Sequence, residues 1–445
     1  MVKRTFKRGV RPPHLKYTSN EPAREIAPKE GCVFIFPMLQ HIGAPCEPTV
    51  AVGDAVLAGQ KIGESNKFVS APIHSSVSGT VVEIRPALTP SGVTVNSVFV
   101  ENDGRYEKHP SLTKSANHKN ISKSEIIGSI REAGIVGLGG AGFPTHVKLS
   151  PPEEKIIDII IVNASECEPY ITTDHRALLD ETDELLGGLQ IILSLFGGAR
   201  GIIAVETNKQ DAIDKLFNEN KSANVEIIPL APKFPQGSER QLIKTCAGRE
   251  VPSGGLPADI GCIVQNASTV VSVFRAVTQS VPLIQKTITV AGGAVKNPGN
   301  YKIPIGMKYR DLIDAIGGFI TEPRKMISGG PMTGVAMFTV NVPFIKTSSC
   351  FLALTENECE TPQERNCFRC GKCLAHCPTG LMPNELNKRA VHSLPDEFEK
   401  YNGAECVECG SCSYICPAKR HLAQSIRVMK RAVIGEKMKR EAASG

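Results

Sequence analysis

Residues 31–105 alternate short apolar runs with glycine and proline turns, a pattern that predicts a region of short β-strands. Residues 123–132 instead carry apolar side chains at helical spacing. The near-continuous apolar run at 155–162 is typical of a buried parallel strand. Beyond it, helical patterns at 176–195 and 209–218 alternate with strand patterns at 201–206 and 225–230. This alternation predicts a parallel sheet with helices on both faces, and so a multidomain α/β plus β chain.

The β-rich region contains two similar halves, Val52–Gln60 and Ser70–Val81. These halves resemble the barrel-sandwich fold of biotinyl and lipoyl carrier domains. Lys67 lies near the hairpin between them, but its spacing is too short, and its neighbours form neither the Met-Lys-Met nor the Asp-Lys-Ala turn of a carrier. We therefore expect a structural barrel-sandwich domain at 31–115, preceded by an N-terminal extension at 1–30.

Residues 286–345 begin with a short predicted hairpin, followed by a helix that ends at Gly317 and Gly318. This order resembles the soluble-ligand-binding β-grasp module. We expect this module to act as a packing spacer rather than as a ligand site.

Eight of the 15 cysteines form two runs with the same spacing, C-x-x-C-x-x-C-x-x-x-C-P. Three cysteines at this spacing can wrap one face of a cuboidal iron–sulfur cluster, and the fourth ligates the cluster of the other run. Zinc sites usually take C-x-x-C pairs with four ligands each, which fits these runs poorly. We therefore predict two 4Fe–4S clusters in a helical double-ferredoxin domain at 346–425. One is held by Cys367, Cys370, Cys373 and Cys416, and the other by Cys406, Cys409, Cys412 and Cys377.

The composition narrows the choice of compartment and ligand. The 445 residues contain no run near eighteen apolar residues, so we expect no transmembrane segment. The basic start lacks the apolar core of a secretory signal, and clusters and free thiols suit a reducing cytoplasm. A net charge of only +6, no Trp and 5% aromatic residues argue against nucleic acid. The basic tail at 426–445 predicts a helix that either faces solvent or docks to an acidic partner or membrane surface.

A glycine-rich segment begins at Gly137, and Gly137, Gly139 and Gly142 satisfy G-x-G-x-x-G. The preceding residues have a helical pattern rather than that of a strand, so we reject an ordinary Rossmann fingerprint. Glycines at this density can still bring backbone N–H groups close to a phosphate or a flat ring, although a turn without a ligand is the alternative. The polar residues 163–169 follow the buried strand, at the edge where open α/β sheets bind ligands.

These two segments resemble the flavin-binding subunit of respiratory complex I and of NAD-dependent hydrogenases and formate dehydrogenases. The family's GxGGxGFPTxxK loop is matched by Gly137, Gly139, Gly140, Gly142, Phe143, Pro144, Thr145 and Lys148. Its NADExEP segment is matched by Asn163, Ala164, Glu166, Glu168 and Pro169, with Ser165 in place of the aspartate. Gln265–Thr269 is similar to a third segment, VNNxET, and Glu239 is a loose match to a GEE segment.

The resemblance implies an α/β domain at 116–285 that binds FMN and admits NAD(H). The glycine loop and Lys148 are expected to contact the FMN phosphate and ring edge, and Asn163 and Asn266 to bond the flavin. Glu166 is expected near the nicotinamide as the catalytic residue, and Glu168 is a further candidate ligand. For both glutamates, a solvated acid at a strand end is the alternative. Ser165 puts one flavin hydrogen bond of the family in doubt.

The order of the modules resembles the peripheral C subunit of the Rnf electron-transport complex over essentially the whole chain. The opening Phe6–Pro13 fits the same family, with Val10 where a second glycine is usual. The resemblance implies an NAD(H)-reacting electron-transfer subunit of a membrane-bound ion-translocating ferredoxin:NAD+ oxidoreductase. It would lie peripherally at the cytoplasmic face of the membrane. Its partners would be the other subunits of the complex, among them an iron–sulfur subunit linked to ferredoxin.

Two alternatives stay open. One is the NADH-oxidising flavin subunit of a soluble NAD-dependent hydrogenase or formate dehydrogenase. The other is a non-catalytic iron–sulfur electron wire whose flavin site has decayed.

Overall fold

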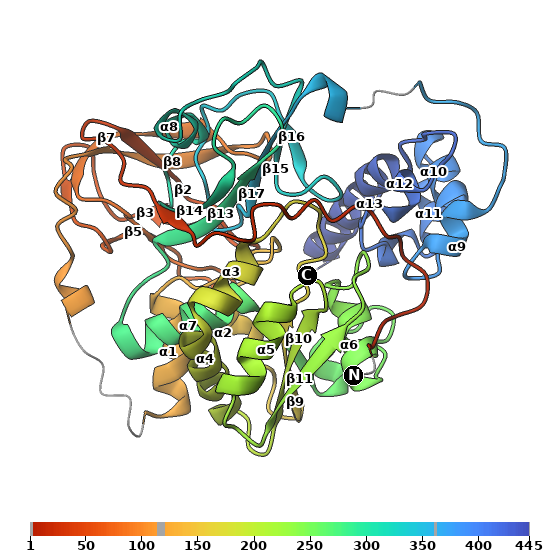
Figure 1. The fold of residues 1–445 in the computed structure, drawn as a ribbon, viewed down its shortest axis with the longest axis horizontal. Coiled ribbons are helices and arrows are strands. Elements are labelled where there is room, and N and C mark those ends of the chain that lie inside the picture. The colour runs from red at the N-terminus through yellow and green to blue at the C-terminus, as the bar shows by residue number, and fades with distance from the viewer. Residues whose placement is uncertain (1–2, 114–120, 360–362, 445) are drawn as a thin grey trace.

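The β-rich region forms two antiparallel sheets in the computed structural model, which describes residues 3–113, 121–359 and 363–444 (Figure 1). This is the barrel-sandwich arrangement that its two halves predict. The first sheet has the order β2 (Val33–Pro37), β8 (Thr94–Asn102), β7 (Gly79–Leu88) and β4 (Ala55–Val56). The second has the order β3 (Glu47–Pro48), β5 (Lys61–Glu64) and β6 (Ile73–His74).

A separate sheet of six strands is built around the predicted hairpin of the β-grasp module. The hairpin is the antiparallel pair β13 and β14, and the helix after it is α8 (Tyr309–Ala315). The full order is β1 (Arg24–Glu25), β14 (Gly299–Pro304), β13 (Gln285–Ala291), β17 (Cys350–Leu354), β15 (Lys325–Ser328) and β16 (Val335–Met337). Strand β1 comes from the predicted extension at 1–30, and β17 lies beyond the predicted boundary at 345. The sheet therefore takes strands from two segments outside the predicted module, one of them near the start of the chain.

The barrel-sandwich and β-grasp modules share one apolar core. Phe34 and Phe36 from β2 belong to the same buried cluster as Ile288, Tyr301 and Tyr309 from the β-grasp module. Burying these faces against each other removes apolar surface from water that neither module could cover alone. The two modules therefore form one packed body.

The central α/β domain has the parallel sheet that the sequence predicts. Its order is β11 (Val225–Leu230), β10 (Arg200–Glu206), β9 (Ile159–Ala164) and β12 (Cys262–Asn266), with every pair parallel. One face packs against α1 (Lys123–Glu132), α4 (Thr182–Ser194), α5 (Gln210–Glu219) and α7 (Ala267–Gln279). The other face packs against α6 (Glu239–Ala247). Both faces are covered, as the continuous apolar strands require.

One predicted helix is wrong in its extent. The pattern at 176–195 predicts a single helix, whereas the chain forms α3 (Thr173–Asp180) and then α4, with a break at Glu181. Glu181 has φ −130° and ψ 31°, outside the helical region. Its carboxylate pairs with Arg275 at 2.8 Å and with Lys302 at 3.3 Å. Those two cations come from α7 and β14, so tertiary contacts compete with the local helical pattern.

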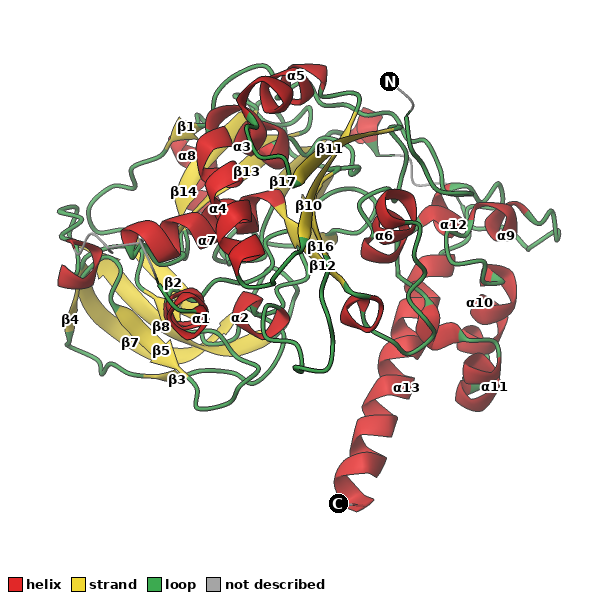
Figure 2. Ribbon diagram, turned by 90° about the horizontal axis from the view of Figure 1, so that it is seen from below, coloured by secondary structure: helices red, strands yellow, loops and turns green. Residues whose placement is uncertain are grey.

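The cysteine-rich region is helical, as predicted. Its helices are α9 (Lys372–His376), α10 (Pro383–Val391), α11 (Pro395–Lys400), α12 (Ser411–Tyr414) and α13 (Leu422–Ser444). Leu386, Phe398, Ile426, Met429 and Val433 form its core. The first half of the predicted basic tail therefore packs inward, and the rest of α13 projects from the body (Figure 2). Short 3-10 segments occur at Pro110–Thr113, Pro257–Ile260, Glu356–Glu358 and Gly403–Glu405, and a one-turn helix α2 at Thr145–Lys148.

The N-terminal segment 3–25, here called the strap, runs across the molecule and touches several modules (Figure 1). Arg4 N–H donates to the Pro229 carbonyl at 3.1 Å, and Gly9 N–H donates to the His376 carbonyl of the cysteine-rich domain at 3.1 Å. Further along, the Asn300 side chain of β14 donates to the Thr18 carbonyl at 2.8 Å. The strap therefore links the α/β, cysteine-rich and β-grasp modules.

Among the residues within 3–113, 121–359 and 363–444, no helix is long and apolar enough to cross a bilayer.

Candidate functional site

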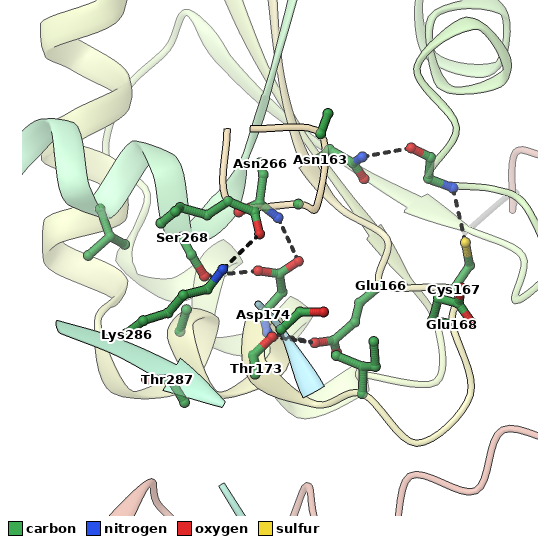
Figure 3. Close-up of a pocket in the computed structure, with 18 of the residues that line it drawn as sticks. Asn163, Glu166, Cys167, Glu168, Thr173, Asp174, Asn266, Ser268, Lys286 and Thr287 are labelled. Carbon is green, nitrogen blue, oxygen red and sulfur yellow. Dashed lines mark hydrogen bonds between the residues drawn. The ribbon is translucent and has the colours of Figure 1, made fainter. Parts of the chain in front are cut away.

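A cavity of about 450 Å³ lies where the α/β domain, the six-stranded sheet and the second cysteine run meet (Figure 3). This volume is within the range of cofactor and small-molecule sites. Its wall contains five of the predicted ligand residues, Gly139, Asn163, Glu166, Glu168 and Asn266. The carboxyl ends of β9 and β12 supply Asn163 and Asn266, because parallel strands bring their ends to one edge of a sheet.

Asn163 fixes the floor of the cavity. Its Nδ2 donates to the Gly237 carbonyl at 2.8 Å, and its Oδ1 accepts from Ser165 N–H at 3.2 Å. Gly237 N–H in turn points at the Cys167 sulfur, 3.4 Å away (Figure 3). The loop after strand β11 is thereby bound to the loop after β9.

Asn266 and Ser268 meet Asp174 on the opposite wall (Figure 3). Asn266 Nδ2 donates to Asp174 Oδ2 at 2.7 Å, and Ser268 Oγ donates to Oδ1 at 2.9 Å. Burial raises the pKa of Asp174, while the bonds from Ser268 and Asn266 act to lower it. Gly139 lies against the same amide, since a Cβ at this position would be 3.4 Å from Asn266. The glycine loop therefore packs directly against the Asn266 side chain.

Glu166 adopts φ 48°, a left-handed conformation that a non-glycine residue rarely takes. Its side chain is 3% exposed and accepts from Asp174 N–H at 2.6 Å and His175 N–H at 3.3 Å, at the start of α3. Lys16 of the strap lies 3.8 Å away. Burial raises the pKa of Glu166, and the positive charge of Lys16 opposes that shift. The carboxylate is therefore held at the wall by the backbone of α3 rather than free in solvent.

Glu168 is also bound into the wall instead of being a solvated strand-end acid. It accepts from Met332 N–H at 3.2 Å and from the Thr333 hydroxyl. Burial raises the pKa of Glu168. Both predicted acidic ligands thus lie at the cavity, and both already have protein partners.

Lys286 brings a buried amine to the cavity. Its Nζ donates to the Lys346 carbonyl at 2.7 Å and to the Leu138 carbonyl of the glycine segment at 3.3 Å. Burial lowers the pKa of Lys286 to about 7. Such an amine can hold or release a proton near neutral pH.

The remaining predicted ligands do not line this cavity. Gly137 N–H donates to the Phe143 carbonyl at 2.9 Å, and Gly142 N–H donates to the Gly137 carbonyl at 3.0 Å, so the loop closes on itself. Gly140 has φ 104° with open space around the position of a Cβ. Lys148 Nζ is 2.6 Å from Glu239, in the first turn of α6. The structure thus joins Lys148 to Glu239 rather than to the cavity.

A second, small cavity contains the predicted second ligand set. Cys406, Cys409 and Cys412 line it together with Cys377 from the first run. Burial raises the pKa of Cys412, and so do the neighbouring thiols of Cys406, Cys409 and Cys377. The fourth cysteine of one run therefore lies with the three of the other, as the interleaved pairing requires. Cys409 also lines the larger cavity, so the two spaces share a wall.

The first ligand set is more exposed than the second. Burial raises the pKa of Cys373, and the thiols of Cys416 and Cys367 add to that rise, which puts these three near one another. Cys370 is exposed, as is Cys367. Within the described ranges, no three His, Cys, Asp or Glu side chains converge as ligands of a single metal ion.

The residues around the larger cavity fit a flavin in size and chemistry. A close-approaching glycine backbone, amides from Asn163 and Asn266, and the Lys286 amine surround a space of about 450 Å³. Ser165 Oγ is buried without a hydrogen-bond partner among the described residues. Several wall residues were not found from the sequence, among them Asp174, Ser268, Lys286 and Gly237. Ser268 falls inside the segment matched at 265–269, and Gly237 lies two residues before Glu239 in the loosely matched GEE segment. Asp174 and Lys286 carry no signal in the sequence alone.

Models of known protein families match each of the four modules of the chain. Four family models match: an RnfC barrel sandwich hybrid domain at 4–105, a Nuo51 FMN-binding domain at 130–275, an SLBB domain at 287–336 and a 4Fe-4S dicluster domain at 361–417. These matches confirm the predicted fold class of each module. The ranges of our predicted domains stay predictions.

Several curated relatives match over most of the chain. The C subunit of the proton-translocating ferredoxin:NAD(+) oxidoreductase complex of Clostridium ljungdahlii is 45% identical over 96% of this chain and 93% of its own length. The C subunit of the Na(+)-translocating complex of Acetobacterium woodii is 43% identical over 98% of both chains. Among solved structures, the NAD+-reducing NiFe hydrogenase in its H2-reduced state has a TM-score of 0.49 and 18% identity, covering 72% of this chain and 62% of that chain.

The modules and the two cavities define a flavin- and iron–sulfur-type electron-transfer protein. At these identities over nearly the full length, the chain belongs to the family of C subunits of ion-translocating ferredoxin:NAD(+) oxidoreductase complexes, the Rnf family. The family resemblance that the sequence indicates is thereby confirmed.

Proposed function

We propose that this chain is the NAD(H)-reacting electron-transfer subunit of a membrane-bound, ion-translocating ferredoxin:NAD+ oxidoreductase. One observation carries the proposal: Cys409 lies in the wall of both the flavin-sized cavity and the cavity of the second ligand set. Electrons can therefore pass between the two spaces without crossing another module. Full-length similarity to the Rnf relatives supports this function over a soluble hydrogenase or formate dehydrogenase subunit.

The larger cavity is proposed to hold FMN and to admit NAD(H). When bound, FMN exchanges a hydride with NAD(H) and exchanges electrons singly with one-electron carriers. In this proposal Gly139, Asn163 and Asn266 position the flavin, and the Lys286 amine supplies a donor at its edge. Gly137, Gly140, Gly142, Phe143 and Lys148 are proposed to shape the loop that carries Gly139, and Lys148 does so through its ion pair with Glu239.

Glu166 is proposed to contact the nicotinamide. Its left-handed backbone and its two bonds from the start of α3 hold the carboxylate in one orientation. Such strain at a cavity wall is common where a side chain must be aimed. Glu168 is proposed to close the same wall against the loop that carries Thr333.

The eight cysteines are proposed to hold two 4Fe–4S clusters in the interleaved pairing. The second set would exchange electrons with the flavin cavity, and the first set with a partner. The partners proposed are the other subunits of the complex, including one linked to ferredoxin. We place the chain peripherally at the cytoplasmic face of the membrane.

The test is an anaerobic titration with NADH. The full chain is reconstituted with iron, sulfide and FMN, and absorbance and EPR spectra are recorded at each addition. Flavin bleaching together with EPR signals of reduced 4Fe–4S clusters is expected. If dithionite reduces the clusters while NADH bleaches nothing, the NAD(H) reaction is refuted and the chain is an electron wire.

A further inference from the structure

The two ligand sets have opposite surroundings. In the second set, Cys377 and Cys412 are buried. In the first set, Cys367 and Cys370 are exposed. Among the described cysteines of the two sets, Cys367 and Cys370 alone are exposed. Because electron exchange between proteins requires close approach, the first set is the better placed of the two to meet another protein directly.

Apolar side chains are exposed on the same segments that carry the first set. Phe368, between Cys367 and Cys370, is 62% exposed, and Tyr414, two residues before Cys416, is 46% exposed. Leu374, next to Cys373, is 38% exposed. Large apolar side chains gathered at a redox site are typical of the centre of a protein contact, where aromatic residues are enriched.

Uncompensated positive charge surrounds these apolar residues. Arg365, Arg369 and Lys372 are exposed, and within the described part of the chain none of their side chains forms an ion pair. Residues 363–376 contain a single acidic residue, Glu364, which lies 3.6 Å from Arg420. Unpaired charge of one sign attracts a surface of the opposite sign and accelerates its encounter.

The charges near the second set are, by contrast, already paired. Glu405 binds Arg240 of the α/β domain at 2.7 Å. Glu408 binds Arg427 at 2.9 Å and Lys430 at 3.3 Å, both from α13. The cations Arg240, Arg427 and Lys430 beside the second set thus already have carboxylate partners, unlike the three cations beside the first set.

We propose that Arg365, Phe368, Arg369, Lys372, Leu374 and Tyr414 form the docking surface for an acidic one-electron carrier protein, here called the docking face. The partner presents carboxylates to the three cations and brings its redox centre against Phe368. Each encounter moves one electron and oxidises the partner by one electron. Two encounters and one proton from water convert one NAD+ to NADH. This inference rests on the proposed function and adds the surface and the charge of the partner.

The test compares two triple variants of the full, cofactor-loaded chain. Arg365→Gln/Arg369→Gln/Lys372→Gln removes the charges of the docking face. Lys29→Gln/Lys67→Gln/Lys296→Gln removes three exposed cations from the barrel-sandwich and β-grasp modules. Iron, sulfide and FMN contents are measured first. Stopped-flow absorbance then follows cluster reduction by a reduced acidic bacterial two-cluster ferredoxin, at several salt concentrations.

The docking-face variant is expected to react with the ferredoxin at least about tenfold more slowly at low salt, and to lose most of its salt dependence. The control variant is expected to behave like the parent chain. Reduction by methyl viologen, which needs no docking, is expected to be equal in all three. If cofactor content falls in the triple variant, Lys372→Gln alone is measured and should show a smaller loss of the same kind.

An unchanged ferredoxin rate and salt dependence in the docking-face variant would overturn the proposal. So would unchanged ferredoxin rates combined with lost binding to phosphatidylglycerol vesicles, which would assign the surface to a membrane. Failure of NADH to bleach the flavin, with the ferredoxin result as expected, would instead remove the NAD(H) reaction and leave the docking face intact.

Discussion

The two cysteine runs have the same spacing but lie in different environments. The second set is enclosed, and Cys409 reaches the wall of the flavin-sized cavity. The first set contains the exposed Cys367 and Cys370, beside cations that form no ion pair with any described residue. In our proposal, the motif supplies the cysteine ligands of each cluster, and packing against the α/β domain decides what each cluster exchanges electrons with.

The strongest test of this difference is to substitute one cysteine ligand in each set. Cys409→Ala is expected to abolish electron flow between NADH and methyl viologen or ferredoxin while leaving flavin bleaching by NADH intact, because the link between the cavities is lost. Cys370→Ala is expected to leave one cluster that NADH still reduces. EPR spectroscopy after NADH addition distinguishes the two variants. Cluster reduction by NADH in Cys409→Ala, with none in Cys370→Ala, would reverse the assignment.

The proposed flavin position in the larger cavity depends on Asp174, which binds Asn266 and Ser268. Asp174→Ala leaves the Asn266 amide and the Ser268 hydroxyl without their acceptor. A buried polar group without a hydrogen-bond partner costs about 1–3 kcal/mol of free energy. We expect FMN affinity to fall about tenfold or more, measured by fluorescence titration of the flavin-free protein. Asp183→Ala, an exposed aspartate in the first turn of α4, serves as the control. Equal FMN affinity in Asp174→Ala and the parent chain would show that this wall does not position the flavin.

Glu405 forms the contact that holds the second set against the α/β domain, and a single substitution can weaken this contact alone. Glu405 accepts from Arg240 at 2.7 Å, Ser253 Oγ at 2.9 Å and Gly254 N–H at 3.1 Å. Glu405→Ala is expected to cost about 1–2 kcal/mol of docking free energy and to slow cluster reduction by NADH without loss of either cofactor. The exposed Glu399→Ala is the matched control. Stopped-flow rates equal to those of the control would exclude a positioning role for Glu405.

The smallest expected effect concerns the cavity alone: the folding stability of the chain should depend on pH through Lys286. The pKa of Lys286 is lowered to about 7 in the folded chain, well below that of an exposed lysine. Below pH 7 this lysine is charged in both states, so its burial destabilises the fold. Above pH 7 it is neutral only when folded, so stability rises with pH, by up to about 1.4 kcal/mol per pH unit. The thermal midpoint of Lys286→Met is expected to rise less between pH 7 and pH 9 than that of the parent chain. Equal slopes would contradict the assignment.

Much of this organisation is predictable from local patterns. The interleaved pairing of Cys377 with the second run follows from the cysteine spacing. The hairpin β13–β14 follows from its turn, and the end of the helix after it follows from Gly317 and Gly318. These features are predictable because each depends on residues close together in the chain. The parallel sheet follows for the same reason, since each apolar strand is recognisable alone.

Other features depend on contacts between distant segments. The break at Glu181 arises from Arg275 and Lys302, and the orientation of Glu166 involves Lys16 of the strap. Strand β17 joins the sheet parallel to β13 from beyond the predicted boundary. Asp174 and Lys286 reach the cavity because α3 and β13 pack there, and no motif marks them. The different exposure of the two cysteine runs is likewise decided by packing.

The central claim is that electrons move from NADH through the flavin cavity to the second ligand set and only then to the first. Rapid-freeze EPR of the reconstituted full chain mixed with NADH tests it most directly, with the two cluster signals assigned from Cys409→Ala and Cys370→Ala. We expect the signal of the second set to appear first and that of the first set to follow. Earlier reduction of the exposed first set would contradict the route.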